Sequence, residues 1–264
     1  MQHVHLFEFT DQSWYPSLFR RIQTDYLEFV TTRGAGHQNL VPLFARALQH
    51  AGTNEILDLC SGAAGPWKRL HTQLRQAGLP VNVTLTDKYP NPEVLQKWTA
   101  LTKDGITYLP EPVDALHIPS HLPGMRTIFE GFHHFKPEQA RLVLQDAVDK
   151  RLAVGIFEAS LVPPQGLVIF LLSPLMTILG YIFATPFILP RTWSRFVWTY
   201  LLPIVPLATC WDGLVSFLRV YSPKDLKQLT GKLYRDDYQW EIGQASTGTP
   251  LFVFTYLVGY PRKP

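Results

Sequence analysis

The chain has 264 residues, 46% of them hydrophobic and 17% charged, with a formal net charge of +3. This length suits one large α/β domain, alone or with an elaboration, and allows a sizeable buried core without cross-links. The basic residues are spread along the sequence and the two cysteines, Cys60 and Cys210, lie far apart, so we expect no nucleic-acid partner, disulfide framework or zinc cluster.

The first 52 residues predict a helical cap. Residues 13–31 place apolar side chains at helical spacing. The charged residues of this segment lie on the opposite side: Arg20, Arg21 and Asp25. A second helix follows, and Gly52 suits the left-handed position just past its end. The opening stretch has no apolar core preceded by positive charge, so we expect no secretory signal.

Five short apolar strands alternate with helices in residues 53–160, and two more strands close the chain. Their central sequences are EILDL, VNVTLTD, ITYL, RTIFE, LAVGIFEAS, YQWEIGQA and PLFVFTYLVGY. The helices between them include one over residues 90–102. A capped helix begins after Ser222, with Asp225 three residues later. The alternation predicts a doubly wound, mostly parallel seven-stranded sheet with an antiparallel edge hairpin.

The first strand ends on Asp58 and is followed by the turn CSGAAG. Ligands of doubly wound sheets bind outside the carboxyl ends of the central strands. Asp87, at the end of the second strand, could accept hydrogen bonds from both hydroxyls of a ribose. Asp114, after the third strand, could accept a hydrogen bond from an exocyclic amine. Together these residues predict a nucleoside site without a phosphate cradle, although the turn alone is equally compatible with an ordinary βα corner.

The ordered segments EILDLCSGAAGPW, TLTDKYP, PVDALHIP, TIFEGFHHF and GIFEAS resemble class I S-adenosylmethionine-dependent methyltransferases. The likeness is greatest to the branch that includes ubiquinone/menaquinone C-methyltransferases. It covers roughly residues 35–160 and resumes near residues 212–261. The resemblance implies a Rossmann-like methyltransferase fold and S-adenosylmethionine as the cofactor.

The resemblance also implies roles for particular residues. The first-strand acid and its turn would hold the methionine part of the cofactor. These residues are Asp58, Cys60, Ser61, Gly62 and Gly65. Asp87 would bind the ribose with Lys88 beside the adenine, Asp114 and Ala115 would contact the adenine amine, and Glu130 lies on the same rim. The turn departs from the usual motif at Cys60 and at Ala64, where glycines are commoner.

Three residues are candidate general bases. His133 and His134 come just past the fourth strand, and Glu158 ends the fifth. A base is needed only when the acceptor atom carries a proton of high pKa. Each residue also has a structural interpretation, because the family often has a similar HHF segment that supports the loop, and Glu158 could bond to a loop backbone.

Five further residues are candidates for contact with the acceptor: Trp14, Tyr26, Asp212, Arg219 and Tyr221. Trp14 and Tyr26, with their neighbour Tyr15, either form a lid or pack as ordinary apolar residues. Asp212 and Arg219 lie two helical turns apart, so they either form a buried pair or contact the substrate. The histidines show no spacing with acids or cysteines that predicts a metal site.

A long uncharged insert follows the fifth strand. Gly166–Pro190 contains no charged residue, and a second uncharged run covers Phe196–Trp211. The first run is long enough to cross a bilayer. The strands on both sides belong to one sheet, however, so the chain must return to the side from which it left. Three arrangements stay open: a helical hairpin on or in one face of a membrane, a lipophilic roof over the site, and a two-pass span.

We therefore expect a helical cap over residues 1–52, a cofactor-binding domain over residues 53–160 and 212–264, and an apolar helical insert over residues 161–211. The expected activity is methyl transfer to a hydrophobic acceptor such as a quinone, isoprenoid or polyketide-like molecule. The expected location is the cytoplasm or the cytoplasmic side of a membrane, with a homodimer possible. The alternatives are a cofactor-binding protein without catalysis, another reaction on the same scaffold, and a membrane anchor with a vestigial methyltransferase fold.

Overall fold

The apolar strands of the sequence form one sheet at the centre of the molecule. The computed structural model describes residues 5–34, 36–91, 94–95, 105–162, 165–233 and 235–262. The strands are β1 (Glu55–Leu59), β2 (Asn82–Leu85), β3 (Ile106–Tyr108), β4 (Met125–Phe129), β5 (Val154–Leu161), β6 (Tyr238–Ser246) and β7 (Phe252–Pro261). The central strands β1 and β4 are buried along almost their whole length, because helices cover both faces.

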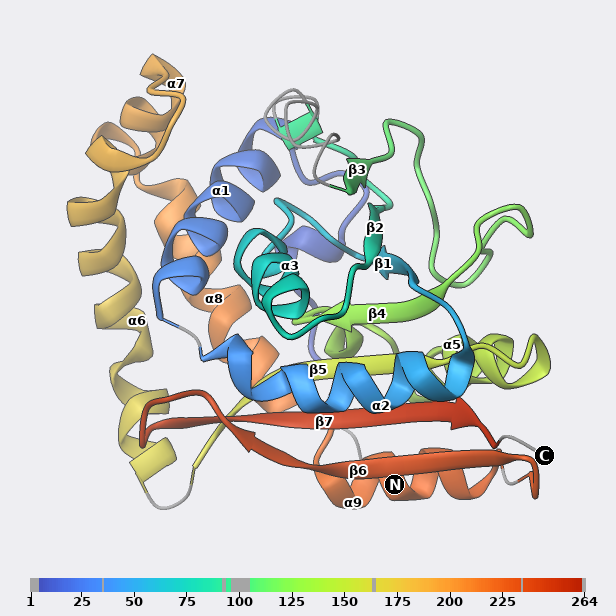
Figure 1. Cartoon of the computed structure of the whole chain (residues 1–264). Coiled ribbons are helices and arrows are strands. Elements are labelled where there is room, and N and C mark those ends of the chain that lie inside the picture. The colour runs from blue at the N-terminus through green and yellow to red at the C-terminus, as the bar shows by residue number, and fades with distance from the viewer. Residues whose placement is uncertain are drawn as a thin grey trace.

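The sheet has the order β3-β2-β1-β4-β5-β7-β6 (Figure 1). Strands β1 to β5 pair in parallel, whereas β7 pairs antiparallel with both β5 and β6. The predicted doubly wound sheet with an antiparallel edge hairpin is confirmed. The parallel strands all end at one edge of the sheet, which we call the carboxyl edge.

Two apolar clusters fill the space between the sheet and its helices. The helices are α1 (Ser17–Gly34), α2 (Val41–Ala51), α3 (Trp67–Gln76), α5 (Pro137–Asp149), α6 (Gln165–Ala184), α7 (Trp193–Phe196), α8 (Ile204–Arg219) and α9 (Pro223–Gly231). One cluster, around Phe44 and Trp67, packs α2 and α3 on one face, and the other packs α5 and α9 on the opposite face. In the predicted helix over residues 90–102, the structure describes only Pro90 and Asn91, which are not helical, and Val94 and Leu95, which are; the rest lies outside the described residues.

Helical ends follow the chemistry of the sequence. Gly52 closes α2 in the left-handed conformation, with φ of 64°. The Ser222 hydroxyl accepts the Asp225 N–H, and the Asp225 carboxylate accepts the Ser222 N–H, which forms the predicted capping box at the start of α9. Short helical turns complete the chain: η1 (Phe9–Asp11), η2 (His37–Leu40), η4 (Phe132–His134), η5 (Thr185–Phe187) and η6 (Val197–Leu201).

The uncharged insert folds into two packed helical arms, and we call residues 165–219 the apolar hairpin. Helix α6 forms one arm, and α7, η6 and α8 form the other, with a bend of 73° between Trp193–Leu201 and Ile204–Arg219. Helix α8 continues to Arg219, beyond the boundary expected at residue 211. By length and composition, the described residues contain one helix that could cross a membrane, Gly166–Phe187, or two if the bent pair counts as one.

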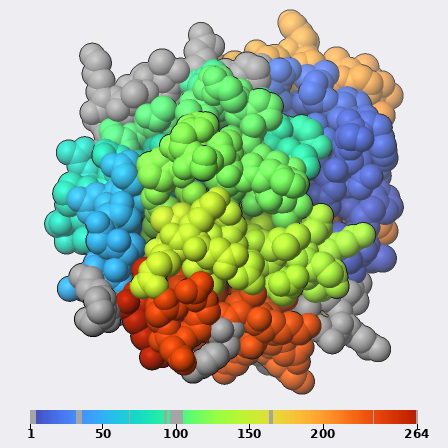
Figure 2. Space-filling model, turned by 90° about the vertical axis from the view of Figure 1, so that its right-hand side faces the viewer, coloured from blue at the N-terminus to red at the C-terminus, as the bar shows by residue number. Residues whose placement is uncertain are grey.

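The apolar hairpin stands beside the sheet, with α1 packed against it (Figure 1). Figure 2 shows the side of the molecule opposite the hairpin. Most of the hairpin is hidden there, and its tip is visible behind α1. A third apolar cluster joins Ile22 and Tyr26 of α1 to Tyr181 of α6 and Val205 of α8. Asp25, expected on the polar side of α1, is buried, because its carboxylate pairs with Arg195 of α7.

Candidate functional site

The turn after β1 has an unusual backbone. Positive φ angles occur at Cys60 (57°), Gly62 (51°), Ala64 (75°) and Gly65 (40°). Residues with a side chain avoid this region, at a cost on the order of 1–2 kcal/mol each. The two positions where the sequence departs from glycine therefore keep the conformation that glycine would favour. An added Cβ at Gly62 or Gly65 would meet no atom within 4 Å, so open space lies beside the turn.

Asp58 at the end of β1 is buried beneath this turn. Its two carboxylate oxygens accept hydrogen bonds from the hydroxyls of Ser61 and Thr127, each at 2.6 Å. Burial raises the pKa of Asp58 to about 7, although these two hydrogen bonds oppose the shift. A cation placed beside Asp58 would therefore favour its charged form.

Asp87 connects the end of β2 to the turn. One carboxylate oxygen accepts the Gly62 N–H at 2.7 Å, and the other accepts the Tyr89 N–H at 2.7 Å. The Tyr108 hydroxyl from β3 donates to the Gly62 carbonyl at 2.9 Å. Each carboxylate oxygen has a second lone pair, so Asp87 keeps capacity for further donors.

Asp114 lies after β3, beside Lys88. The Lys88 ammonium is 2.9 Å from Asp114 Oδ2, and the Leu116 N–H donates to Oδ1 at 2.9 Å. Burial acts to raise the Asp114 pKa, but these two donors outweigh it and lower the pKa. The hydrogen bond to Asp114 raises the pKa of Lys88. The structure thus brings Asp58, Asp87, Lys88 and Asp114 to the carboxyl edge, with Ala115 buried next to Asp114.

Glu130 follows β4 with a φ of 50°. Its carboxylate accepts the Ala159 N–H, which joins the ends of β4 and β5. The side chain reaches solvent but has protein on most sides, and this burial, with the nearby charge of Glu158, raises its pKa to about 8. Glu130 and Asp58 are thus two carboxyl groups at this edge whose pKa is raised.

His133 and Glu158 form a buried pair behind the carboxyl edge. Glu158 Oε1 accepts the Phe132 N–H at 2.6 Å, and Oε2 lies 2.6 Å from His133 Nδ1. Burial acts to raise the Glu158 pKa, but the charge and hydrogen bond of His133 lower it. The other ring nitrogen of His133, Nε2, faces Glu8 at 3.9 Å.

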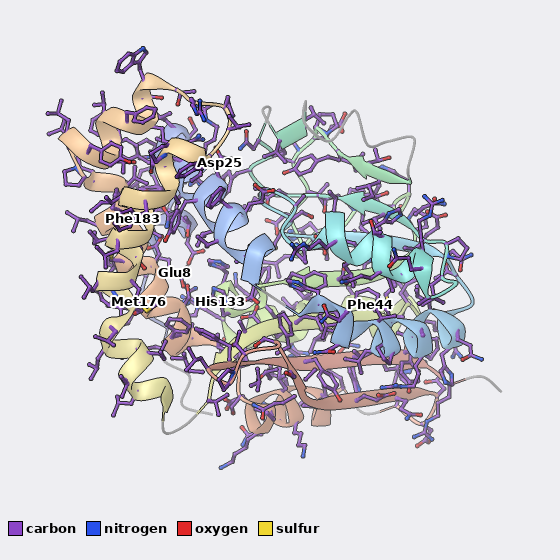
Figure 3. All side chains as sticks on the ribbon, turned by 60° about the vertical axis from the view of Figure 1, so that its left-hand side comes forward. Glu8, Asp25, Phe44, His133, Met176 and Phe183 are labelled. Carbon is purple, nitrogen blue, oxygen red and sulfur yellow. The ribbon has the colours of Figure 1, made fainter. Side chains whose placement is uncertain are left out.

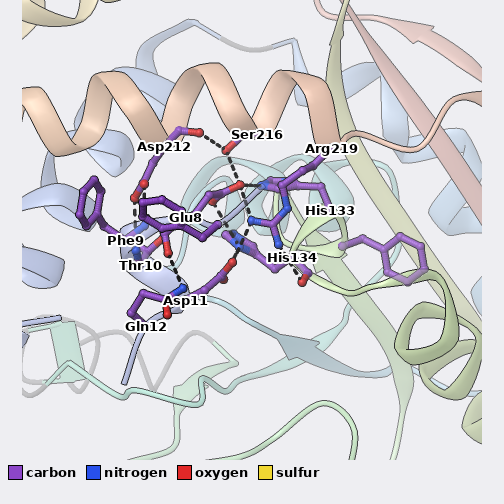
Figure 4. Close-up of polar contacts among 12 residues, drawn as sticks. Glu8, Phe9, Thr10, Asp11, Gln12, His133, His134, Asp212, Ser216 and Arg219 are labelled. Carbon is purple, nitrogen blue, oxygen red and sulfur yellow. Dashed lines mark hydrogen bonds and ion pairs between the residues drawn. The ribbon is translucent and has the colours of Figure 1, made fainter. Parts of the chain in front are cut away.

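His134 belongs to a second polar group, formed with residues 5–12, which we call the N-terminal segment (Figure 4). Its Nδ1 lies 2.7 Å from Asp11 and 3.4 Å from Glu8. Burial lowers the His134 pKa, yet the Asp11 hydrogen bond and the two acidic charges outweigh it and raise the pKa to about 9. His134 is therefore charged at neutral pH, and a charged imidazole has no lone pair to accept a proton.

Arg219, at the end of α8, completes this group. The fully buried guanidinium lies 2.8 Å from Glu8 and 2.8 Å from Asp11, and it donates to the His134 carbonyl at 3.0 Å. Asp212, two turns earlier, accepts the Phe9 N–H at 2.7 Å and a Gln23 side-chain hydrogen bond at 2.8 Å. Both residues thus lie on one side of α8, as their spacing predicted, but they do not pair with each other: both contact the N-terminal segment instead.

The remaining candidates lie apart from the carboxyl edge. The Tyr221 hydroxyl donates to the Phe135 carbonyl at 2.7 Å, and its ring is buried. Tyr26 stacks on Tyr181 with ring centroids 3.8 Å apart. Trp14 is 65% exposed and contacts the rings of Phe9 and Tyr15.

Sequence reasoning missed the acids of the N-terminal segment. Glu8 and His133 lie between the apolar hairpin and the sheet (Figure 3). The one available signal was a lone glutamate between two phenylalanines, FEF at Phe7–Phe9, since an acid among apolar residues is buried only with a partner. That partner, Arg219, is more than 200 residues away in the sequence.

Glu8, His133 and His134 are also the one group among the described residues that offers three close metal-ligand atoms, all within 4.8 Å of one another. The Arg219 guanidinium is already bonded to Glu8, and Asp11 to His134. A metal ion would have to share Glu8 with this positive charge. The contacts therefore describe an ion-pair network rather than a metal centre.

No protein-family model and no curated protein matches the sequence. Solved structures do match the fold. The plantazolicin methyltransferase, solved with a triazolic desmethyl analogue and SAH, has a TM-score of 0.50 and 9% identity over 92% of this chain and 98% of that one. This match and the strand order show a Rossmann-like methyltransferase fold.

Two further structures are similar at lower TM-scores. The magnesium protoporphyrin IX methyltransferase of Synechocystis PCC 6803, with bound SAH, has a TM-score of 0.42 and 16% identity over 84% of this chain and 83% of that one. The mitomycin 7-O-methyltransferase has a TM-score of 0.44 and 13% identity over 86% of this chain. This chain spans only 54% of the mitomycin enzyme. None of the three is a quinone C-methyltransferase, so that branch stays a prediction.

Proposed function

We propose that the chain binds S-adenosylmethionine at the carboxyl edge and transfers its methyl group to a hydrophobic small molecule. One observation supports this above the others. The left-handed turn after β1 is bonded through Gly62 to Asp87 at the end of β2, directly beside the buried Asp58. Nucleoside ligands of doubly wound sheets bind at this edge.

The residues present fit the cofactor. The open space beside Gly62 and Gly65 gives a ligand close access to the backbone. Asp87 has lone pairs left for two ribose hydroxyls. Burial raises the pKa of Asp58, so a neighbouring ammonium group would stabilise its charged form. Lys88 and Asp114 lie where the resemblance to methyltransferases places the adenine.

When bound, S-adenosylmethionine supplies a methyl carbon to which the acceptor's nucleophile bonds while the carbon–sulfur bond breaks and its electron pair stays on sulfur. For an acceptor atom that carries a proton, we assign proton removal to His133. Glu158 holds His133 at Nδ1, which leaves Nε2 as the accepting atom. His134 is charged at neutral pH, and Glu158 is a weaker base than an ordinary carboxylate because His133 lowers its pKa.

A hydrophobic acceptor is supported by the elements around His133. The last turn of α8, which ends the apolar hairpin, bonds directly to the loop that carries His133, through Arg219 and the His134 carbonyl. A quinone, isoprenoid or polyketide-like molecule would match the apolar side chains of the hairpin, and it matches the branch that the sequence resembles. Trp14 and Tyr26 would then contact the acceptor from the cap, Asp212 from the hairpin, and Tyr221 from the link between α8 and α9.

A cofactor-binding protein without methyl transfer is the second candidate. The observation that favours it is the burial of His133, which is 5% exposed with Nε2 facing Glu8. In this arrangement an acceptor reaches Nε2 only after the N-terminal segment has moved. Transfer of labelled methyl groups separates the two candidates.

Isothermal titration calorimetry with S-adenosylmethionine and S-adenosylhomocysteine tests the cofactor site. Wild-type protein should bind both ligands. Asp87→Asn should weaken binding by about tenfold or more, because a hydrogen bond to a charged group contributes about 1.5–3 kcal/mol. Asp149→Asn, an exposed acid at the end of α5, should bind as wild type. Absence of binding by the wild-type protein, or equal binding by Asp87→Asn, contradicts the assignment.

A further inference from the structure

The outer side of the apolar hairpin is exposed along its whole length. Large apolar side chains with more than half of their area exposed lie on α6 and continue past its end: Leu167, Val168, Leu171, Leu175, Met176, Phe183, Phe187 and Leu189. In the candidate membrane-spanning window of this helix, only 11% of the residues are buried. Met176 and Phe183 lie on the hairpin, away from the sheet (Figure 3). A soluble protein rarely exposes so large an apolar surface without a partner.

The inner side of the hairpin already has its partner, helix α1. Tyr26 of α1 stacks on Tyr181 of α6. Gly180 leaves room for this contact, because a Cβ at that position would overlap the Tyr26 hydroxyl. Close packing against α1 therefore fixes which side of α6 faces outward.

The tip of the hairpin is fixed to the same helix. Arg195 is 2% exposed, and its guanidinium pairs with Asp25 and donates to the carbonyls of Ile188 at 2.9 Å and Pro190 at 2.7 Å. Trp193, two residues earlier, is 87% exposed. The tip thus combines a buried polar attachment with an exposed indole, a side chain that favours the boundary between lipid and water.

The attachment to α1 argues against a crossing of the bilayer. Helix α1 runs beside α6 and carries Arg20, Arg21, Asp25 and Glu28. If α6 crossed the hydrocarbon layer with its present packing, these charges would enter it too, at a high cost in free energy. An orientation with α6 lying in the surface of one leaflet keeps α1 on the water side.

The charge of the exposed surface selects its partner. From Ala159 to Trp211 the sequence has no aspartate or glutamate, and its two basic residues are Arg191 and Arg195. Asp25 neutralises Arg195, whereas Arg191 lies at the surface and bonds only a backbone carbonyl among the contacts of the described residues. The surface is therefore apolar with a positive charge at its tip, which complements an anionic lipid head group.

The distribution of exposed apolar side chains over the hairpin favours lipid over a second copy of the chain. Exposed apolar side chains occur on α6, around the tip and on the other arm, where Leu201 is 73% and Leu207 59% exposed. The exposed apolar side chains thus occur on both arms of the hairpin and not on one arm alone. A flat dimer contact would cover one arm, whereas a leaflet can surround both.

We propose that the apolar hairpin docks the protein onto an anionic membrane by inserting into one leaflet without crossing it. Helix α1 is the rigid support of the inserted arms, Trp193 lies at the lipid–water boundary, and Arg191 contacts lipid phosphate. This docking is independent of the proposed methyl transfer, because no residue of the carboxyl edge takes part.

Flotation with lipid vesicles tests the docking. The wild-type chain should float with vesicles of phosphatidylcholine and phosphatidylglycerol in equal parts, and more weakly with phosphatidylcholine alone. The triple variant Leu171→Gln, Leu175→Gln, Phe183→Gln should lose about a thousandfold in partitioning, since each inserted apolar side chain contributes roughly tenfold. Arg191→Gln should lose about fivefold, and only with anionic vesicles.

Controls separate the docking from effects on folding. Leu142→Gln, on α5, changes a side chain that is 50% exposed outside the hairpin and should float as wild type. All variants should keep the wild-type melting temperature, because the changed side chains are exposed. Two results overturn the proposal: wild-type protein that stays out of the vesicle fraction, or a stable dimer in solution that the triple variant converts to a monomer and vesicles do not dissociate.

Discussion

The ion pair between Arg195 and Asp25 holds the tip of the apolar hairpin on α1, so breaking it should destabilise the protein strongly. Both side chains are buried, at 2% and 10% exposure. Removal of one partner from a buried pair costs about 3–5 kcal/mol, because the other charge keeps its desolvation without its counter-ion. Arg195→Met also removes the hydrogen bonds to Ile188 and Pro190, each worth about 0.5–1.5 kcal/mol.

Thermal unfolding followed by circular dichroism measures the effect. We expect Arg195→Met and Asp25→Leu each to lower the melting temperature by roughly 10 °C, given about 2–4 °C per kcal/mol for a chain of this size. The double variant should cost less than the sum of the two, because neither charge then stays buried. Arg191→Met, at the exposed position nearby, should change the free energy of unfolding by less than about 0.5 kcal/mol. The stabilising role of this ion pair would be refuted if each single variant lost less than about 1 kcal/mol of unfolding free energy. It would also be refuted if the double variant lost the full sum of the two.

Three further predictions follow from other contacts. Gly180→Ala should destabilise the chain by about 1–3 kcal/mol through overlap with the Tyr26 hydroxyl, and Tyr26→Phe should restore most of the loss in thermal melts. The His134 pKa is raised from 6.5 to about 9, so its contribution to stability is full below pH 6.5 and disappears as the pH rises through 9. Urea unfolding should therefore show His134→Gln about 1–3 kcal/mol less stable than wild type at pH 6 and equal to it near pH 10, and a constant difference would contradict the assignment. Asp58 has a pKa raised from 3.8 to about 7, so Asp58→Asn should gain stability relative to wild type as the pH rises from about 4 to 7, and a gain on acidification instead would contradict it.

The sheet could be predicted from the sequence because its signals are local. Each parallel strand is a short apolar run bounded by turn residues, and burial on both faces follows from helices on both sides. The positions of Asp58, Asp87 and Asp114 could be predicted for the same reason. Parallel strands end at one edge, so residues that follow them meet there.

The hydrogen-bond partners of those acids and of the turn could not be predicted, because they come from other strands. Thr127 of β4 bonds Asp58, and Tyr108 of β3 supports the turn at Gly62. The sequence showed that Cys60 and Ala64 replace glycines, but only the backbone shows that both still have positive φ.

The contacts between the N-terminal segment, α1 and the hairpin were beyond local reasoning. Asp25 stands among polar residues on a helix of mixed character, and nothing nearby in the sequence marks it as buried. Its partner Arg195 and the Glu8–Arg219 pair join segments at opposite ends of the chain. Such pairs join segments that are distant in the sequence, so helical periodicity alone assigns Asp25 to the wrong side.

The central claim is methyl transfer to a hydrophobic acceptor, and incorporation of labelled methyl tests it most directly. The protein would be incubated with S-adenosylmethionine labelled at the methyl group and a total lipid extract of cells that produce it. We predict that label enters the organic-soluble fraction with wild-type protein, and that Asp87→Asn reduces the rate by about tenfold or more at limiting cofactor. Wild-type protein that binds the cofactor in calorimetry but leaves the organic fraction unlabelled would contradict the account.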